Sequence, residues 1–246
     1  MLALPQFPVD LARLLCRGAA SAYDTELPPE SIWPGAKVSW VRSPLATAAV
    51  VKTDNLQFVL CRGTADIEDW AVDLSAAQTD SACCRGSLHS GFAASAGSVY
   101  LGIKSALEKQ TPIYLTGHSK GAAEATIIAA GLASAGFNVA GLFTFGSPRV
   151  CNPAAASTFP NSFPTWRIVD SDDLVPHLPF PETVIGWRVY VYRHVGTFVH
   201  LRADGTIAVG ENAWEELKQD ALAIMRARGC IRSHFIDRYE RALAAA

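Results

Sequence analysis

A serine between two glycines is the residue of this chain best placed to do chemistry. Ser119 lies in the sequence Gly117-His118-Ser119-Lys120-Gly121, after the apolar run 113–116 and before a stretch rich in small residues. A strand that leads at once into a helix holds such a serine on a strained turn, for which the flanking glycines leave space. The helix N-terminus also favours negative charge there. The pattern therefore predicts that Ser119 is a nucleophile.

A serine hydroxyl needs a nearby imidazole to take its proton, and a carboxylate must fix the tautomer of that imidazole. In proteins whose nucleophilic serine lies between a strand and a helix in this way, the acid and then the base come after the serine in the sequence. This order excludes His89 and His118 as the base. The histidines that remain are His177, His194, His200 and His234. His234 is favoured because it precedes an amphipathic helical pattern that Ser233 could cap, where the helix dipole makes a carboxylate partner useful. The other three are expected to be hydrogen-bonded core or surface residues.

The acid should lie on a loop after a strand. The predicted strand 166–169 runs directly into the sequence DSDDLVPHLP, which contains Asp170, Asp172 and Asp173. The residues alone leave the choice among these three open, and two of them are expected to be solvated loop acids.

The elements that position these residues form an alternating series. Apolar, β-rich runs alternate with helical patterns, which is typical of a sheet covered by helices. Strands are predicted at 47–51, 56–61, 113–116, 142–145, 166–169 and 188–192, followed by a hairpin that turns at Asp204-Gly205. Helices are predicted at 10–23, 94–109, 120–135, 213–228 and from Ser233 onward.

No repeat or linker divides the chain, so we expect one domain over residues 1–246. The charge-free stretch 125–148 has the length of a membrane span, but its glycines and Asn138 favour a helix, a turn at 136–138 and a buried strand. We therefore expect no transmembrane segment.

Six sequence motifs occur in a familiar order between Leu60 and Tyr239. They are CRGTADIEDW, HSGF, LTGHSKGA, TFGSPRV, DDLVPHLP and a late SHF. Together they resemble the class 3 lipases, the fungal-type triacylglycerol lipase family of the α/β-hydrolase fold. The resemblance implies a central, mostly parallel sheet flanked by helices. It also implies Ser119 as nucleophile, Asp173 as acid and His234 as base.

The same resemblance implies an oxyanion hole made by the backbone amides of Thr64 and Lys120, and it implies no cofactor and no metal. The sequence departs from the family pattern at three positions: Cys61, where an aromatic residue is common, Lys120, where leucine is usual, and Cys151, where glycine is common. Lys120 still supplies an amide, while its ammonium group should change the local field or pair with a nearby acid. The departures bear on substrate preference more than on the chemistry.

A short amphipathic helix is predicted after Thr64. Ile67, Trp70, Ala71 and Leu74 recur at the spacing of one helix face, and acidic residues occupy the other faces. The helix could pack on the core by its apolar stripe. The resemblance implies instead a lid, which covers the site in water and exposes its apolar face at a lipid surface. Because its acidic face weakens attraction to anionic lipid, short neutral esters are as credible as emulsified fat.

Composition limits the alternatives. The 246 residues carry 21 Lys+Arg against 23 Asp+Glu, and half are hydrophobic, so neither nucleic-acid binding nor disorder is expected. The N-terminal sequence lacks the basic and apolar regions of a secretory signal, so the expected location is cytoplasmic, or extracellular if the sequence is a mature form. Six cysteines without paired CxxC spacing predict reduced thiols in the cytoplasmic case and no zinc site.

The expected function is a metal-free serine ester hydrolase, a lipase that cleaves acylglycerols or related fatty-acyl esters through an acyl-enzyme. A short-chain carboxylesterase, a feruloyl esterase, a phospholipase A1 and an acyltransferase would share the same triad. A peptidase and a non-catalytic binding module on a hydrolase scaffold are the alternatives from other classes. The expected partner is a lipid or a small ester, with transient contact at a lipid interface, and the sequence leaves the oligomeric state open.

Overall fold

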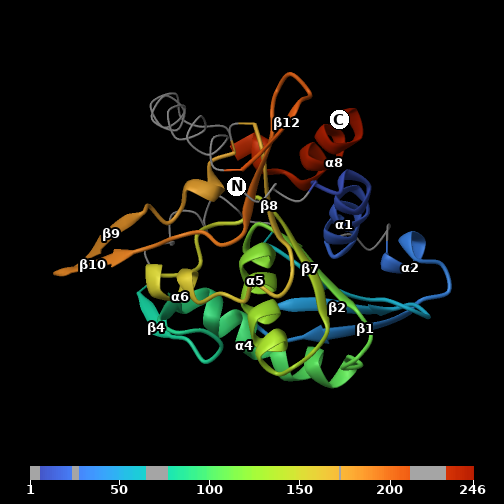
Figure 1. Cartoon of the computed structure of the whole chain (residues 1–246), viewed down its shortest axis with the longest axis horizontal. Helices are drawn as coiled ribbons and strands as arrows, with labels where there is room; N and C mark the ends of the chain where they lie inside the picture. The colour runs from blue at the N-terminus through green and yellow to red at the C-terminus, as the bar shows by residue number, and fades with distance from the viewer. Residues whose placement is uncertain (1–5, 24–27, 65–76, 172, 211–230) are drawn as a thin grey trace.

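An eight-stranded sheet runs through the computed structural model, which describes residues 6–23, 28–64, 77–171, 173–210 and 231–246 (Figure 1). The strand order is β1-β2-β3-β6-β7-β8-β11-β12. The strands are β1 (Lys37–Arg42), β2 (Thr47–Lys52), β3 (Gln57–Cys61), β6 (Ile113–His118), β7 (Val139–Phe145), β8 (Thr165–Asp170), β11 (Thr197–Leu201) and β12 (Ile207–Val209). The five strands from β3 to β11 are parallel, and β1, β2 and β12 add antiparallel edges. The predicted mostly parallel sheet is therefore confirmed.

Helices cover both faces of the sheet, because successive strand residues point to opposite sides. On one face α1 (Val9–Ser21) packs against α8 (Ile236–Ala245), above the Phe58 and Leu60 side chains of β3. On the other face α4 (Ser90–Ala106) and α5 (Lys120–Ser134) pack over Val59 and Cys61. The parallel strands thus lie in the interior, and their carboxyl ends meet at one edge of the sheet.

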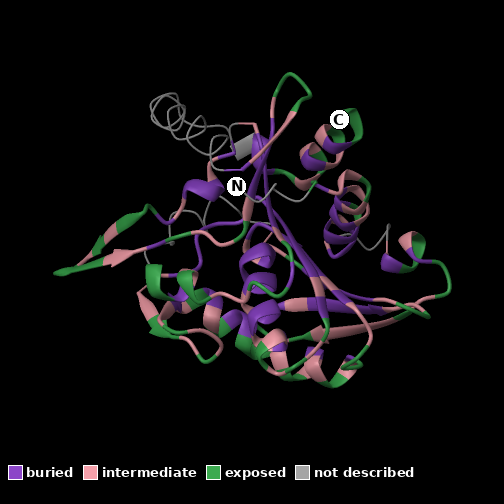
Figure 2. Cartoon of the chain, in the orientation of Figure 1, coloured by how far each residue is buried: buried purple, intermediate pink, exposed green. Residues whose placement is uncertain are grey.

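Smaller elements complete the described chain. The short helices are α2 (Pro29–Ile32) and α6 (Pro153–Ser157), with 3-10 turns η1 (Val175–His177) and η2 (Ile231–His234). Two hairpins stand outside the main sheet, one formed by β4 (Gln78–Asp80) and β5 (Ser87–His89), the other by β9 (Glu182–Ile185) and β10 (Arg188–Val191). Figure 2 shows the buried residues concentrated in the sheet and the helices that face it, whereas the β9–β10 hairpin carries exposed and intermediate residues only.

Most predicted elements occur with boundaries shifted by a few residues. The predicted helix 94–109 begins earlier, at Ser90, because His89 ends β5 and accepts a hydrogen bond from the Phe92 amide as the N-cap. The prediction that Ser233 caps the last helix is wrong. Residues 231–234 form the 3-10 turn η2, and α8 begins at Ile236 after an N-cap at Phe235 that has no side-chain cap.

Two predicted helices, the lid candidate at 67–74 and the segment 213–228, lie outside the described residues. The charge-free stretch 125–148 forms most of α5, a turn at Gly136 and β7, as predicted. None of the helices in the described part of the chain combines the length and the apolar character that a bilayer span requires.

Candidate active site

Ser119 lies on a strained turn between β6 and α5, as its flanking glycines predict. Its backbone adopts φ 58 and ψ −129, and its side chain is buried. A Cβ on Gly117 would lie 2.4 Å from the backbone of Gly121, and a Cβ on Gly121 would lie 2.3 Å from the carbonyl oxygen of Cys61. Both glycines are therefore required by close backbone contact among β3, β6 and α5, and this contact keeps Ser119 at the carboxyl end of β6.

The segment that contains Thr64 leaves the sheet beside Ser119. Cys61 at the end of β3 pairs with Gly117 of β6 in parallel register, so the residues that follow both strands emerge at the same edge. A Cβ on Gly63 would lie 1.9 Å from the Tyr23 hydroxyl and 2.5 Å from the carbonyl oxygen of His118. Glycine at position 63 thus allows the Thr64 segment to approach the Ser119 turn closely.

The structure brings Asp173 and His234 together in the interior. Nδ1 of His234 lies 2.8 Å from Oδ2 of Asp173, and both side chains are fully buried. The Val175 amide donates to Oδ1 of Asp173 at 2.9 Å, and the Tyr239 hydroxyl donates to Oδ2. Burial alone would raise the pKa of Asp173, but its interactions with His234, Tyr239 and Val175 together hold that pKa below its ordinary value. The carboxylate therefore stays ionised and accepts a hydrogen bond from Nδ1–H of His234.

This hydrogen bond leaves the other nitrogen of His234 as an acceptor. His234 Nε2 and the Ser119 hydroxyl are both buried, and neither has a hydrogen-bond partner among the residues that the structure describes. Gly146 follows β7 with φ +59, and a Cβ there would lie 2.8 Å from Asp173 Oδ2 and 2.8 Å from His234 Cε1. Glycine at position 146 therefore leaves space for the buried pair.

His118 supports His234 from the side, a contact that sequence order did not reveal. Its Nε2 donates to the His234 carbonyl oxygen at 2.5 Å, and its Nδ1 accepts from the Tyr23 hydroxyl at 3.0 Å. The tautomer follows because a carbonyl oxygen can only accept. The two imidazole rings lie 4.5 Å apart. Burial, reinforced by His234, lowers the pKa of His118 to about 3, so this ring remains neutral.

The other candidates for acid and base have different partners. Asp170 is buried and accepts from Arg238 Nε at 3.1 Å, which corrects the expectation of a solvated loop acid, because α8 brings an arginine to the end of β8. Asp172 lies outside the described residues. Backbone carbonyls accept from His194 and from His200, at 2.8 and 3.1 Å, as expected for structural histidines. His177 is buried in η1, where burial lowers its pKa to about 4.

A family model described as lipase (class 3) matches residues 58–183, which is just over half of the chain. The chain belongs to the class 3 lipase family. Secreted mono- and diacylglycerol lipase 1 of Fusarium solani is 34% identical over 161 residues, which cover 61% of this chain and 47% of that protein. Phospholipase A1-II 1 of rice is 44% identical over 77 residues, which cover 29% of this chain and 19% of the rice protein. The chain thus spans about half the length, or less, of these curated relatives.

Solved structures of lipases establish the fold. Lipase II from Rhizopus niveus superimposes with a TM-score of 0.72 at 23% identity, covering 92% of each chain. The native propeptide complex of Rhizomucor miehei lipase gives 0.63 at 25% identity, covering 84% of this chain and 72% of the other. The predicted α/β-hydrolase fold is therefore confirmed.

In the structure Lys120 forms an ion pair, one of the two outcomes expected for it. Its Nζ lies 2.7 Å from Oε1 of Glu124, one helical turn along α5, and donates to the Leu45 carbonyl oxygen at 2.6 Å. Ser95 of α4 also donates to Glu124, whose side chain is only 1% exposed. Burial raises the pKa of Glu124, and the nearby ammonium of Lys120 opposes that rise. The side chain of Lys120 is thus occupied, while its backbone amide lies at the start of α5, directly after Ser119.

The two cysteines that depart from the family pattern, Cys61 and Cys151, are buried thiols. Cys61 packs with Val59 and Ala125 in the core under α4 and α5, and burial raises its pKa. Cys151 packs with Leu88 and Phe92, and burial also raises its pKa. Both therefore act as small apolar core residues. The described cysteines are all free in the structure, and Cys230 lies outside the described residues.

Proposed function

We propose that this chain is a serine ester hydrolase of the lipase type, with Ser119 as nucleophile, His234 as base and Asp173 as acid. One observation carries the proposal: the buried Asp173 carboxylate holds His234 Nδ1–H at 2.8 Å, which leaves Nε2 able to take a proton. Ser119 supplies that proton from a strained turn at the carboxyl end of β6. These are the three roles that acyl transfer requires.

The reaction proceeds in two halves. As Ser119 Oγ bonds to the ester carbonyl carbon, His234 Nε2 takes the hydroxyl proton, and Asp173 stabilises the imidazolium that forms. His234 then gives this proton to the alcohol oxygen as the carbon–oxygen bond breaks, which leaves the acyl group on Ser119. Water attacks the acyl-enzyme by the same route, and the products are a carboxylic acid and the free serine.

The backbone amides of Thr64 and Lys120 hold the oxyanion of each tetrahedral intermediate. The close packing of Gly63 against Tyr23 and His118 supports this role for the Thr64 segment. The position of Lys120 at the first turn of α5, where amides have no helical acceptor, supports the second donor. Each such donor contributes roughly 3 kcal/mol to transition-state stabilisation.

The proposed substrates are fatty-acyl esters of glycerol. This choice is supported by the Fusarium solani relative, whose name specifies mono- and diacylglycerol. Phospholipase A1 activity is the second candidate, because the rice relative with that name is 44% identical over its shorter match. Export of the protein is proposed on similar grounds, because the related lipases from Fusarium solani and Penicillium cyclopium are named as secreted.

The proposal is tested by measuring hydrolysis of p-nitrophenyl esters from acetyl to palmitoyl with the parent chain and with Ser119→Ala. We expect that Ser119→Ala abolishes turnover while circular dichroism stays unchanged. A fluorophosphonate probe should label the parent on Ser119, as identified by peptide mass spectrometry, and should not label the variant. Ester turnover by Ser119→Ala would exclude Ser119 as the nucleophile.

The chain-length profile then separates lipase from esterase. Turnover that peaks at long chains and rises when the ester forms an emulsion supports a lipase with a lid at Ile67, Trp70, Ala71 and Leu74. Turnover confined to short chains supports a carboxylesterase with the same triad. Release of fatty acid from phosphatidylcholine but not from diacylglycerol supports the phospholipase A1 alternative.

A further inference from the structure

The β9–β10 hairpin projects from the body of the molecule, and Figure 1 shows it extending beyond the other described elements on its side. Its strands have four residues each and pair in antiparallel register, Val184 opposite Val189. Gly186, with φ +60, and Trp187 form the two-residue turn at its tip. A left-handed glycine at the first turn position is typical of tight hairpins, and it leaves Trp187 at the outermost point of the ribbon.

Large apolar side chains on this hairpin face solvent. Trp187 is fully exposed, Val184 is 69% exposed and Val189 is 60% exposed. Val184 and Val189 lie directly opposite each other, so their side chains share one face of the ribbon. Phe180, where the chain enters the hairpin, is also exposed. Four of the seven large apolar residues found exposed in the described chain thus belong to one projecting element, and such clusters mark interaction surfaces.

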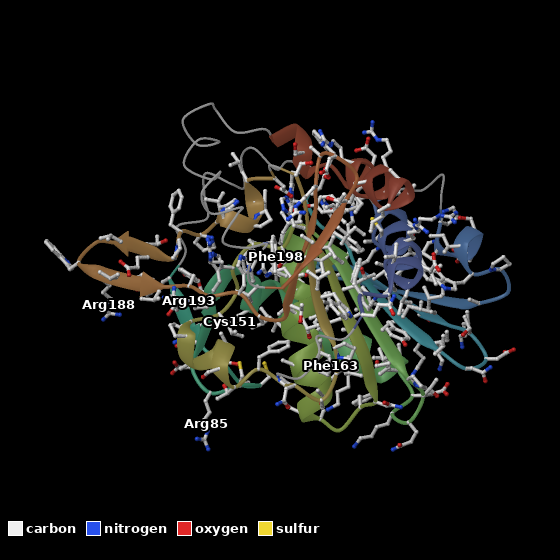
Figure 3. The ribbon with its side chains drawn as sticks, turned by 45° about the horizontal axis from the view of Figure 1, so that its top comes forward. Arg85, Cys151, Phe163, Arg188, Arg193 and Phe198 are labelled. Carbon is white, nitrogen blue, oxygen red and sulfur yellow. The ribbon has the colours of Figure 1, made fainter. Side chains whose placement is uncertain are left out.

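The hairpin segment carries few charged residues, and its net charge is slightly positive. Arg188 lies beside the tip and Arg193 nearer the body, as labelled in Figure 3, and Glu182 is the acidic residue of the segment 180–193. Arg188 can reach a phosphate group while its stem stays with the apolar side chains, as arginine does at membrane interfaces. A net charge of about +1 adds roughly 1 kcal/mol of attraction to an anionic surface, so the apolar side chains supply most of the binding.

We propose that the β9–β10 hairpin is a lipid-surface anchor, with Trp187 at its tip inserted at the boundary between headgroups and acyl chains, and with Val184 and Val189 behind it at the level of the headgroups. The indole ring combines an apolar body with an N–H donor and is enriched at bilayer interfaces for that reason. The ribbon is too small for a stable protein interface, which involves about 20–30 residues a side. A lipid surface accepts a narrow apolar insertion without needing a complementary groove.

The position of the hairpin connects this anchor to the proposed site. The chain runs from Asp173 through η1 into β9, which begins at Glu182, nine residues after Asp173. The inference rests on the proposed function in one respect, because an ester hydrolase acting on lipid must hold its site at the lipid surface. The anchor would tether the molecule to that surface through the segment that follows Asp173.

The test measures binding of the full chain to vesicles of phosphatidylcholine, in a Ser119→Ala background that prevents turnover. Flotation gives the bound fraction, and phosphatidylcholine with brominated acyl chains reports whether tryptophan fluorescence is quenched. Trp187→Ser should weaken binding about tenfold and remove most of the bromine quenching, because a buried indole is lost from the interface. The double variant Val184→Ser with Val189→Ser should weaken binding by a similar factor.

The matched control is Leu101→Ser, which removes a large apolar side chain that is 74% exposed on α4. This control should bind vesicles like its parent, and circular dichroism should confirm that every variant folds. Equal binding by the parent and Trp187→Ser, or no binding by the parent, overturns the proposal. A parent that dimerises in sedimentation velocity through Trp187, without binding vesicles, also overturns it in favour of self-association.

Failure of this inference is distinguishable from failure of the proposed function. If the chain shows Ser119-dependent ester turnover but no Trp187-dependent binding to vesicles, the anchor alone is refuted. Trp187-dependent vesicle binding by a chain without ester turnover supports the anchor and refutes the hydrolase.

Discussion

The two neighbours of Ser119 in the sequence belong to different clusters of buried polar groups, one joined by hydrogen bonds and the other built around an ion pair. His118 belongs to a histidine cluster, which we define as Tyr23, His118, Asp173, His234 and Tyr239 and which is joined by hydrogen bonds. Its one carboxylate accepts two of these bonds, from His234 and Tyr239, and a third from the Val175 amide outside the cluster. A buried carboxylate that is satisfied in this way holds one arrangement, which suits a group that must keep a fixed geometry.

Lys120 belongs to an ion-pair cluster, which we define as Ser95, Lys120, Glu124 and the Leu45 carbonyl. Here two full charges meet at 2.7 Å, and Oε2 of the buried Glu124 has no hydrogen-bond partner among the described residues. A buried pair of this kind gains little net stability, yet removing one partner leaves a costly charge. The comparison teaches that changes in the histidine cluster should alter the rate, whereas changes in the ion-pair cluster should alter stability.

The strongest test of the histidine cluster is Asp173→Asn. We expect kcat to fall by about 10⁴, because an amide that donates to His234 would favour the tautomer with its proton on Nε2. The matched control is Asp170→Asn, which removes a buried carboxylate paired with Arg238 at 3.1 Å. Steady-state kinetics with a soluble ester should show a much smaller loss for the control. Equal losses would mean that Asp173 is not the acid.

The ion-pair cluster is tested by Lys120→Leu. The substitution keeps the backbone amide but leaves the Glu124 carboxylate buried without its cation, so we expect about 2–3 kcal/mol of destabilisation. Urea unfolding followed by circular dichroism measures the change. The double variant Lys120→Leu with Glu124→Leu should recover most of the loss, because both charges are then absent. If the single variant is as stable as the parent, the pair has no structural role.

A smaller effect on rate is expected from His118→Leu, which removes the donor to the His234 carbonyl and the acceptor for Tyr23. We expect kcat/KM to fall about tenfold to a hundredfold, because a buried carbonyl loses its partner and His234 loses a lateral support. Tyr23→Phe should cost less, since it removes the hydroxyl and keeps the ring. Pre-steady-state acylation rates would separate this positioning effect from general destabilisation, and a normal acylation rate in His118→Leu would contradict it.

The pH dependence of stability should also distinguish the clusters. Burial holds the pKa of His118 at about 3, below the ordinary value of 6.5 that the unfolded chain has. As pH falls from 6.5 toward 3, the unfolded state binds a proton that the folded state does not, so this group lowers stability by about 1.4 kcal/mol per pH unit. Urea unfolding between pH 7 and pH 4 measures the slope. His118→Leu should reduce it by one proton, and an unchanged slope would show that His118 does not titrate in this way.

The predicted helices and strands agree with the structure where the residue pattern is continuous within one segment. The strand and helix on either side of Ser119 were predicted within two residues at each end, because their apolar and small-residue patterns are continuous. The strands β1, β4, β5 and β9 are not predicted. The strands β4 and β5 are short, and β1 and β9 are half exposed, so their sequences lack a continuous apolar run. The cap assigned to Ser233 failed because η2 intervenes before α8.

The sequence by itself determined the turn at Ser119, because the glycine requirement and the change from strand to helix depend on a few consecutive residues. Only the tertiary structure decided which aspartate contacts His234, since that pair is 61 positions apart and Asp170 is taken by Arg238. It also decided that His118 supports the His234 carbonyl, 116 positions away, while Lys120 turns to Glu124. The physical reason is that these contacts form when parallel strands align their carboxyl ends at one edge, and no local pattern specifies which distant side chains meet there.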